Sequence, residues 1–199
     1  MTYSIIGTGQ VGRTLAAIFQ KSGLEVGLAN SRGVDVAGPI AKEVGSKIVA
    51  KSVEGALEAD IIVFAVPFLK FKEIGALRSD WTGKIVVDVT NAFMLPQDVK
   101  EAELSGQPSS QVNSTRVPGA KLVKAFNQLP MTVLASAVPD GGRRVIFTAS
   151  DDPEAAAAVG ELIGNLGLAP IYVGKIAEGG LLIQARNALV FQNLIKFDR

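Results

Sequence analysis

The feature that most constrains the fold is a glycine-rich turn near the amino terminus. Residues 3–6 read Tyr-Ser-Ile-Ile, a short segment typical of a buried strand, and the turn Gly-Thr-Gly-Gln-Val-Gly follows at once over residues 7–12. Residues 15–19 are then apolar at helical spacing. In dinucleotide-binding folds, this order of strand, turn and helix holds a pyrophosphate at the helix amino terminus. Gly7 permits the sharp turn, Gly9 lets the backbone approach the phosphates, and Gly12 lets the helix pack close to the strand.

A polar turn after the next predicted strand indicates which dinucleotide is bound. Residues 24–29 form that strand, and Asn30, Ser31 and Arg32 follow it, about twenty residues beyond the last motif glycine, where the adenosine ribose lies in this fold. An acidic residue there would bind the 2′-hydroxyl and repel a phosphate. The amide, hydroxyl and guanidinium found instead suit a 2′-phosphate. We therefore predict NADP rather than NAD, the alternative being that these residues form only a polar turn.

Strand-like and helix-like segments alternate along the whole chain. Further strands are expected at 47–50, 60–67, 84–90, 121–126, 144–149 and, as the last strand, 169–173; helices are expected at 34–45, 52–57, 68–77, 97–104, 130–137 and 152–166. This alternation predicts an α/β fold with a doubly wound, mostly parallel sheet, the NAD(P)-binding Rossmann fold, in one domain over residues 1–199. Residues 95–118 have little apolar periodicity, and we expect them to form a long surface connection that covers the cofactor mouth.

Three of the predicted strands end in segments that should meet at one edge of the sheet. Ligands of doubly wound folds bind outside the carboxyl ends of the strands. The segment Ala65-Val66-Pro67 ends one strand and includes candidate cofactor contacts. The candidates to line the nicotinamide are the residues at these strand ends: Pro67, Phe68, Asn91, Phe126, Asn127 and Pro130. The alternative for each of them is ordinary edge packing or a turn.

Composition excludes several kinds of chemistry. The chain contains no histidine and no cysteine, so imidazole-dependent triads, thiolate nucleophiles and metal sites with His or Cys ligands are excluded, and we predict no metal site. The formal net charge of +1 gives no reason to expect nucleic acid as a partner. The longest apolar runs, such as 61–69, are too short to span a bilayer. With no visible secretory signal, we expect a cytoplasmic protein without membrane insertion.

The carboxyl-terminal segment has a different pattern from the other predicted helices. Apolar residues in 178–197 are distributed around more than one face, which predicts a long helix buried on two sides. The helix would either fill the core of its own domain or pack against a second subunit. We favour the second arrangement, a homodimer, because little sequence remains to cover a second face.

The chain resembles the small NADP-binding oxidoreductases typified by NADPH:coenzyme F420 oxidoreductase, and the related cytosolic domains of STEAP-type metalloreductases. The resemblance covers nearly the whole chain. It depends on five matching pieces: residues 7–12, Asn30-Ser31-Arg32, Ala65-Val66-Pro67-Phe68, Val87-Asp88-Val89-Thr90-Asn91 and Val123-Lys124-Ala125-Phe126-Asn127.

The resemblance implies roles for individual residues. It places the pyrophosphate at Thr8, Gly9, Gln10 and Val11, the 2′-phosphate at Ser31 and Arg32, and the nicotinamide end beside Val66, Ala125 and Asn127. Relatives often carry a basic residue shortly after the Ser-Arg pair, whereas residues 33–36 here contain none. The strength of the preference for NADP is therefore open.

The leading functional hypothesis is an NADPH-dependent oxidoreductase that passes hydride between NADP and a planar redox acceptor of the deazaflavin (coenzyme F420) or flavin type. Hydride transfer between stacked rings needs proximity, roughly 3–3.5 Å between reacting atoms, and exclusion of water. It requires no histidine, in agreement with the composition.

Two alternatives remain open. One is a carbonyl or imine reductase related to pyrroline-carboxylate reductase or the β-hydroxyacid dehydrogenases. Lys124 and Lys175 are its only evident proton donors, and both are better explained as solvated surface residues. The other alternative is a non-catalytic module that senses NADPH. The sequence does not identify the acceptor, the direction of hydride flow or the pathway.

Overall fold

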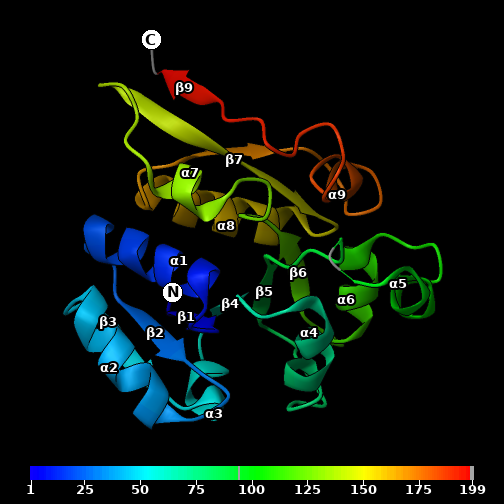
Figure 1. Cartoon of the computed structure of the whole chain (residues 1–199), viewed down its shortest axis with the longest axis horizontal. Helices are drawn as coiled ribbons and strands as arrows, with labels where there is room; N and C mark the ends of the chain where they lie inside the picture. Colours follow the sequence, from blue (N-terminus) through cyan, green and yellow to red (C-terminus); the bar gives the residue numbers. More distant parts are fainter. Residues whose placement is uncertain (94, 198–199) are drawn as a thin grey trace.

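A computed structural model describes residues 1–93 and 95–197 and shows a sheet between two layers of helices. In this described part, strands pair in the order β3-β2-β1-β4-β5-β6-β7-β8, and β9 lies beside β7 (Figure 1). The strands are β1 Tyr3–Ile6, β2 Val26–Ala29, β3 Ile48–Lys51, β4 Ile61–Phe64, β5 Ile85–Asp88, β6 Lys121–Lys124, β7 Gly142–Ser150, β8 Ala169–Tyr172 and β9 Ile195–Phe197. The order 3-2-1-4-5-6 is that of the doubly wound dinucleotide-binding fold, so the predicted fold class is confirmed.

Helices cover both faces of the sheet, as the alternation of segments predicts. The helices are α1 Gln10–Ser22, α2 Val34–Val44, α3 Val53–Ala56, α4 Phe68–Gly75, α5 Gln97–Leu104, α6 Ser109–Thr115, α7 Met131–Ala135, α8 Pro153–Asn165 and α9 Gly179–Leu182. Successive strand residues point to opposite faces. Ile5 therefore packs with α1, α2, α7 and α8 in one core, and Ile6 packs with α3 and α4 in the other.

The sheet changes direction at β7. All pairs from β3 to β6 are parallel, but β7 runs antiparallel to β6, with Val123 opposite Ser150. Beyond that point, β7 pairs in parallel with β8 and antiparallel with β9. The sheet is therefore mostly parallel, as predicted, with a carboxyl-terminal extension built around β7.

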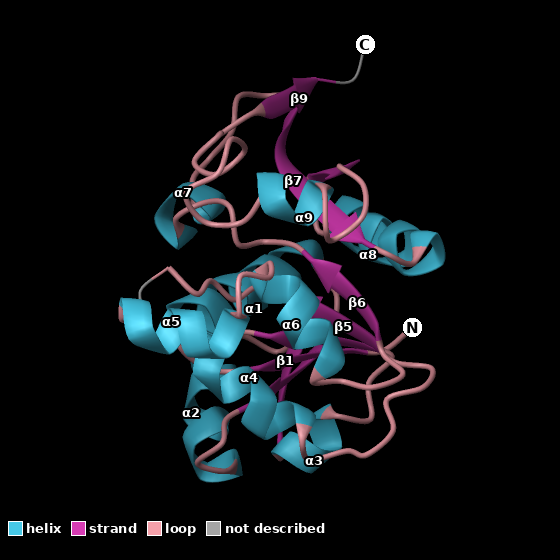
Figure 2. Cartoon of the chain, turned by 90° about the vertical axis from the view of Figure 1, so that its right-hand side faces the viewer, coloured by secondary structure: helices cyan, strands magenta, loops and turns pink. Residues whose placement is uncertain are grey.

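The predicted long helix over 178–197 is wrong. Only α9 is helical there; turns follow, and β9 rather than β8 is the last strand (Figure 2). The backbone of this segment forms turn hydrogen bonds within itself and also bonds to distant partners. Asn127 donates to the Ile183 carbonyl, the Phe191 N–H donates to the Gln128 carbonyl, and the Val145 N–H donates to the Leu194 carbonyl. A helix would need those carbonyl and N–H groups for its own ladder.

The expectation of a plain surface connection over 95–118 is also wrong in part. Helix α5 has the expected bounds, but α6 was not expected, and its residues Ser109, Ser110 and Asn113 are buried. Polar residues can be buried when they are hydrogen-bonded, and Ser110 and Asn113 both donate to the Asp88 carboxylate. Periodicity of apolar residues therefore gave no signal for α6.

Within the described residues, no helix combines the length and the apolar character that crossing a membrane requires.

Candidate functional site

The glycine turn has the geometry that its sequence predicts. Gly7 has φ of 122°, and a Cβ there would lie 2.0 Å from the Ala65 carbonyl oxygen. A Cβ on Gly12 would lie 1.9 Å from the Gly7 carbonyl oxygen. These two glycines are required because strand β4, the turn and α1 approach one another closely. A Cβ on Gly9, by contrast, would meet no atom within 4 Å, so Gly9 faces open space.

The start of α1 leaves donors available at this open space. Gly9 is the N-cap residue of α1, and no side chain among the described residues caps the helix there. The first turn of a helix has N–H groups without partners in the helix, and the helix dipole adds partial positive charge. An anion at Gly9 would therefore find backbone donors and little steric hindrance.

The first of three adjoining hollows lies beside the polar turn that follows β2. It has a volume of about 460 Å³ and is lined by residues 6–9, Asn30, Ser31, Arg32, residues 65–67 and, from α4, Lys70, Glu73 and Ile74. The Asn30 amide bonds on both sides: its Nδ2 donates to Thr8 Oγ1, and its Oδ1 accepts from the Arg32 N–H at 2.8 Å. Asn30 thus holds the polar turn against the glycine turn.

Two cations, Arg32 and Lys70, are among the described residues that line this first hollow. The Arg32 side chain makes no hydrogen bond or ion pair with the residues that the structure describes. Lys70, from α4, was not predicted as a site residue, and its ammonium is 2.8 Å from the Glu73 carboxylate. Nothing in the sequence near 31–36 signals Lys70, because only the fold brings α4 to the polar turn.

The second hollow continues along the carboxyl ends of the strands. Its volume is about 320 Å³, and it shares Gly9, Ala65, Val66 and Pro67 with the first. The remaining lining consists of Gln10, Val11, Phe68, Val89, Thr90 and Asn91. The structure therefore brings the end of β4 and the end of β5 to the start of α1, as expected for strand ends that meet at one edge of the sheet.

The third hollow adjoins the second at Asn91. Its volume is about 340 Å³, and it is lined by Asn91, Phe93, Asn127, Leu129, Pro130, Ala185, Arg186, Val190 and Phe191. Asn91, Asn127 and Pro130 were predicted as site residues. The lining residues from 185–191 were not predicted as site residues, since a helix was expected there. Ala125 and Phe126 are buried and line none of the three hollows.

Two amide side chains join the second and third hollows. Asn91 Nδ2 donates to the Asn127 carbonyl at 3.1 Å, and Asn127 Nδ2 donates to Asn91 Oδ1 at 3.2 Å and to the Ile183 carbonyl at 2.7 Å. Because the Asn127 Nδ2 faces two acceptors, the amide orientation is determined. Asn127 Oδ1 is buried with no partner among the described residues. An unpaired buried acceptor is costly to stability.

A buried ion pair lies beneath these amides. Lys124 Nζ is 3.6 Å from the Asp88 carboxylate, and the side chains are 1% and 0% exposed. Lys124 also donates to the Thr90 carbonyl at 3.0 Å. The expectation of a solvated Lys124 is therefore wrong. Its side chain lies on the face of the sheet where α6 packs against β6, and Ser110 and Asn113 of α6 bind the paired Asp88 carboxylate. Lys175 is exposed, as expected.

The Asp88 carboxylate has a complete set of donors. It accepts from the Thr90 N–H and hydroxyl at 2.8 and 2.7 Å, from Ser110 at 2.7 Å and from Asn113 at 3.2 Å. Burial by itself would raise the pKa of this carboxyl, but the Lys124 charge and the bonds from Ser110 and Thr90 outweigh it and lower the pKa. The ion pair thus fixes Thr90 and, through it, the position of Asn91.

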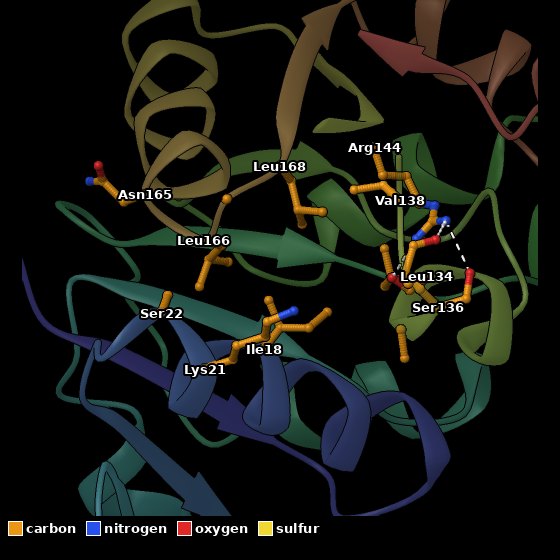
Figure 3. Close-up of a pocket in the computed structure, with 13 residues that line it drawn as sticks. Ile18, Lys21, Ser22, Leu134, Ser136, Val138, Arg144, Asn165, Leu166 and Leu168 are labelled. Carbon is orange, nitrogen blue, oxygen red and sulfur yellow. Dashed lines mark hydrogen bonds between the residues drawn. The ribbon is translucent and has the colours of Figure 1, made fainter. Parts of the chain in front are cut away.

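A fourth cavity is separate from this row of hollows. It has a volume of about 310 Å³ and lies between the end of α1, the segment after α7 and the end of α8. Figure 3 shows Arg144 beside it, bonded to Ser136 and Leu134. Arg144 is buried and its guanidinium also donates to Asn193 at 2.9 Å. Its donors are therefore occupied by protein groups, and Arg144 serves to join α7 to the carboxyl-terminal segment.

Comparison with known proteins agrees with this geometry. Residues 2–92 match the family model described as NADP oxidoreductase coenzyme F420-dependent. A hypothetical protein from Sinorhizobium meliloti is 40% identical, with 98% of this chain and 96% of that chain covered and a TM-score of 0.90.

Two further solved structures share the fold at lower identity. A protein from Arthrobacter sp. FB24, described as an F420-dependent NADP reductase, is 21% identical, with 88% and 86% coverage and a TM-score of 0.66. A reductive aminase from Aspergillus terreus, in complex with NADPH and ethyl levulinate, is 19% identical with a TM-score of 0.60. The match covers 89% of this chain but only 56% of the aminase, so this chain spans about half of that enzyme.

The sheet order, the glycine turn and the adjoining hollows define a dinucleotide-binding protein of the Rossmann type. Residues 2–92 carry the match to the coenzyme F420-dependent NADP oxidoreductase family, and the chain is an NADP-dependent oxidoreductase.

Proposed function

We propose that this enzyme passes hydride between NADP(H) and a planar redox acceptor of the flavin or deazaflavin type. The observation that carries the proposal is the row of three adjoining hollows along the carboxyl ends of β1, β4, β5 and β6. Adjacent hollows share residues, Gly9 and Ala65 between the first and second and Asn91 between the second and third. One extended cofactor fits the first two, and the third remains for a partner ring.

The first hollow supports placement of the adenosine end. Ser31 and the unpaired Arg32 supply a hydroxyl and a guanidinium for a 2′-phosphate, which guanidinium groups bind by charge-assisted hydrogen bonds. The pyrophosphate would then lie on the first turn of α1, against Thr8, Gly9, Gln10 and Val11, where Gly9 leaves space and the helix offers free donors. These residues therefore fit the cofactor.

The second hollow supports placement of the nicotinamide. Val66, Pro67 and Phe68 line one side, and Asn91 lines the boundary with the third hollow. When bound, NADPH supplies a hydride, and the acceptor takes it with one proton from water, so that NADP⁺ and the reduced acceptor result. The task of the protein is to orient the two rings and exclude water. Ala125 and Phe126, being buried, act by positioning Asn127.

The third hollow supports an apolar, ring-shaped acceptor. Its lining is predominantly apolar, with Phe93, Leu129, Pro130, Val190 and Phe191 around the two amides. Sites of this composition bind the apolar body of a ligand, with a few polar groups that set its orientation. A flavin or deazaflavin ring, which also has N–H groups, fits this lining.

The second candidate is reduction of an imine or carbonyl. Its support is the structural similarity to the Aspergillus terreus reductive aminase, of which only 56% is covered by the match. Purified protein should be assayed for NADPH oxidation at 340 nm with FMN, coenzyme F420, a cyclic imine, and a ketone plus amine. Turnover with the flavin or deazaflavin alone supports the proposal, whereas turnover with the imine alone contradicts it. Tight NADPH binding without any turnover would instead support the non-catalytic sensing module.

We also propose a homodimer formed through the carboxyl-terminal region. Leu181, Leu182, Leu194 and Phe197 are exposed there, at 39%, 43%, 46% and 54%, and a subunit interface would bury such apolar side chains. Light scattering should give the dimer mass for the wild type and the monomer mass for Phe197→Glu. Leu77→Glu, at a residue 52% exposed on another part of the chain, is the matched control and should remain dimeric. A wild-type monomer would contradict this proposal.

A cytoplasmic location is the last part of the proposal, and cell fractionation with an antibody against the chain tests it.

A further inference from the structure

Among the described residues that line the third hollow, Arg186 is the one cation. Its side chain is exposed, and within residues 1–93 and 95–197 it forms no hydrogen bond or ion pair. The other polar lining residues, Asn91 and Asn127, bond to each other and to the backbone. Among the described lining residues, Arg186 is therefore the one charged group with free hydrogen-bond donors for a ligand anion.

The backbone around Arg186 is held in an unusual conformation. Arg186 has φ of 74° and Phe191, on the same hollow, has φ of 65°. Residues other than glycine rarely adopt positive φ, and such strain persists only where surrounding contacts impose it. Here the Asn187 N–H bonds to the Gln184 carbonyl, and the Leu189 N–H bonds to the Leu182 carbonyl. The turn thus places Arg186 at the edge of the hollow at a cost in backbone energy, which favours a functional role.

The apolar surface beside Arg186 completes the pattern. Phe93 and Phe191 are exposed, at 41% and 71%, and both line this hollow. Exposed aromatic rings offer a surface on which a flat ligand can stack. The unpaired guanidinium beside them can bind an anionic group at the edge of that ligand through two hydrogen bonds. A neutral ligand would leave the guanidinium without a partner.

We propose that Arg186 selects acceptors that carry an anionic group, phosphate or carboxylate, on a chain attached to the ring. This inference deepens the proposed function and rests on it for the place of the ring. The electron balance is that of the proposed reaction: one hydride from NADPH and one proton from water reduce the acceptor, and the anion takes no part in the chemistry.

The test compares two acceptors that share one ring and differ only in charge, FMN and riboflavin. Binding of each to the protein saturated with NADP⁺ is measured by calorimetry, and NADPH oxidation with each is measured separately. The wild type should bind FMN at least tenfold more tightly than riboflavin. Arg186→Ala should lose at least tenfold in FMN affinity and leave riboflavin affinity unchanged. Arg186→Lys should retain part of the preference, because the charge remains while the bidentate geometry is lost.

Controls separate this role from a structural one. Lys21→Ala removes an exposed cation at the separate cavity of Figure 3 and should leave both affinities unchanged. Thermal unfolding of Arg186→Ala should match the wild type, and its NADPH affinity should be unchanged.

Three results would overturn the inference. The first is equal affinity of the wild type for FMN and riboflavin, and the second is an equal loss of affinity for FMN and riboflavin in Arg186→Ala. The third is a loss of NADPH affinity in Arg186→Ala, which would place Arg186 at the cofactor. The binding result is independent of turnover. Selective FMN binding without turnover would therefore contradict the proposed function and leave the anion site supported.

Discussion

The two ends of the cofactor cleft are built in different ways. The phosphate end is built mainly from two short continuous stretches, residues 7–12 and 30–32, with residues 65–67 and α4 completing its wall, and its shape depends on backbone geometry at Gly7, Gly9 and Gly12. The acceptor end brings together Asn91, Asn127 and residues 185–191, and side-chain hydrogen bonds connect these separate stretches. Local sequence therefore specifies the phosphate end, whereas long-range contacts specify the acceptor end. The predictions below test this difference.

The largest effect is expected at the ion pair beneath the acceptor end. Lys124→Met leaves the buried Asp88 carboxylate without its counter-charge, and breaking a buried pair in this way costs about 3–5 kcal/mol. Urea unfolding measures the loss. The phosphate end is built independently, so NADP⁺ affinity of the folded variant should fall less than about tenfold, or 1.4 kcal/mol.

A double variant tests the cause of that loss. Adding Asp88→Asn to Lys124→Met removes the uncompensated charge and should recover a large part of the stability. No recovery would mean that lost packing around the Lys124 side chain, rather than charge, explains the effect.

The glycine turn should respond in two distinct ways. Gly12→Ala forces a Cβ toward the Gly7 carbonyl, and overpacking of this kind costs about 1–3 kcal/mol of stability. Gly9→Ala, where a Cβ meets no protein atom within 4 Å, should leave stability within about 0.5 kcal/mol of the wild type. It should nevertheless weaken NADPH binding at least about tenfold, because the methyl group takes the space proposed for the pyrophosphate. Unchanged NADPH binding in Gly9→Ala would contradict that placement.

Arg32→Ala should change the choice between cofactors. Loss of a charge-assisted contact with the 2′-phosphate should weaken NADPH binding by at least about 1.4 kcal/mol, a tenfold change, while NADH binding stays nearly constant. Lys70→Ala should have a smaller effect, because the Lys70 ammonium is already paired with Glu73. Fluorescence titration with both cofactors provides the measurement. Equal weakening of NADPH and NADH would show that Arg32 has a structural role instead.

The smallest effect is expected for Gln184, which connects the acceptor end to α6. Its Oε1 accepts from the Ser109 N–H at 2.9 Å and from the Ser109 hydroxyl at 3.2 Å. Gln184→Ala should cost about 1 kcal/mol of stability and raise the KM for the acceptor, while the Kd for NADPH stays unchanged. A parallel change in both constants would contradict the separation of the two ends.

The sequence predicted most of the fold because the signals for it are local. The apolar runs of β4 and β5, the glycine turn and the alternation of segments each depend on residues close together in the chain, and the helix bounds of α5 agree with the prediction. The polar turn at Asn30 to Arg32 and the strand ends at Pro67, Phe68, Asn91 and Asn127 also lie where they were expected, beside the hollows.

The sequence by itself therefore determined the mostly parallel character of the sheet and the position of the phosphate end. The preference for NADP is an expectation from the sequence. Only the tertiary structure decided that 183–194 would turn rather than form a helix, that Lys124 would be buried against Asp88, and that Lys70 and Arg186 would reach the cleft. Each of these outcomes depends on hydrogen bonds, ion pairs or packing between residues far apart in the chain. Apolar periodicity records which face of a segment is buried, but it carries no record of which distant partner will cover that face.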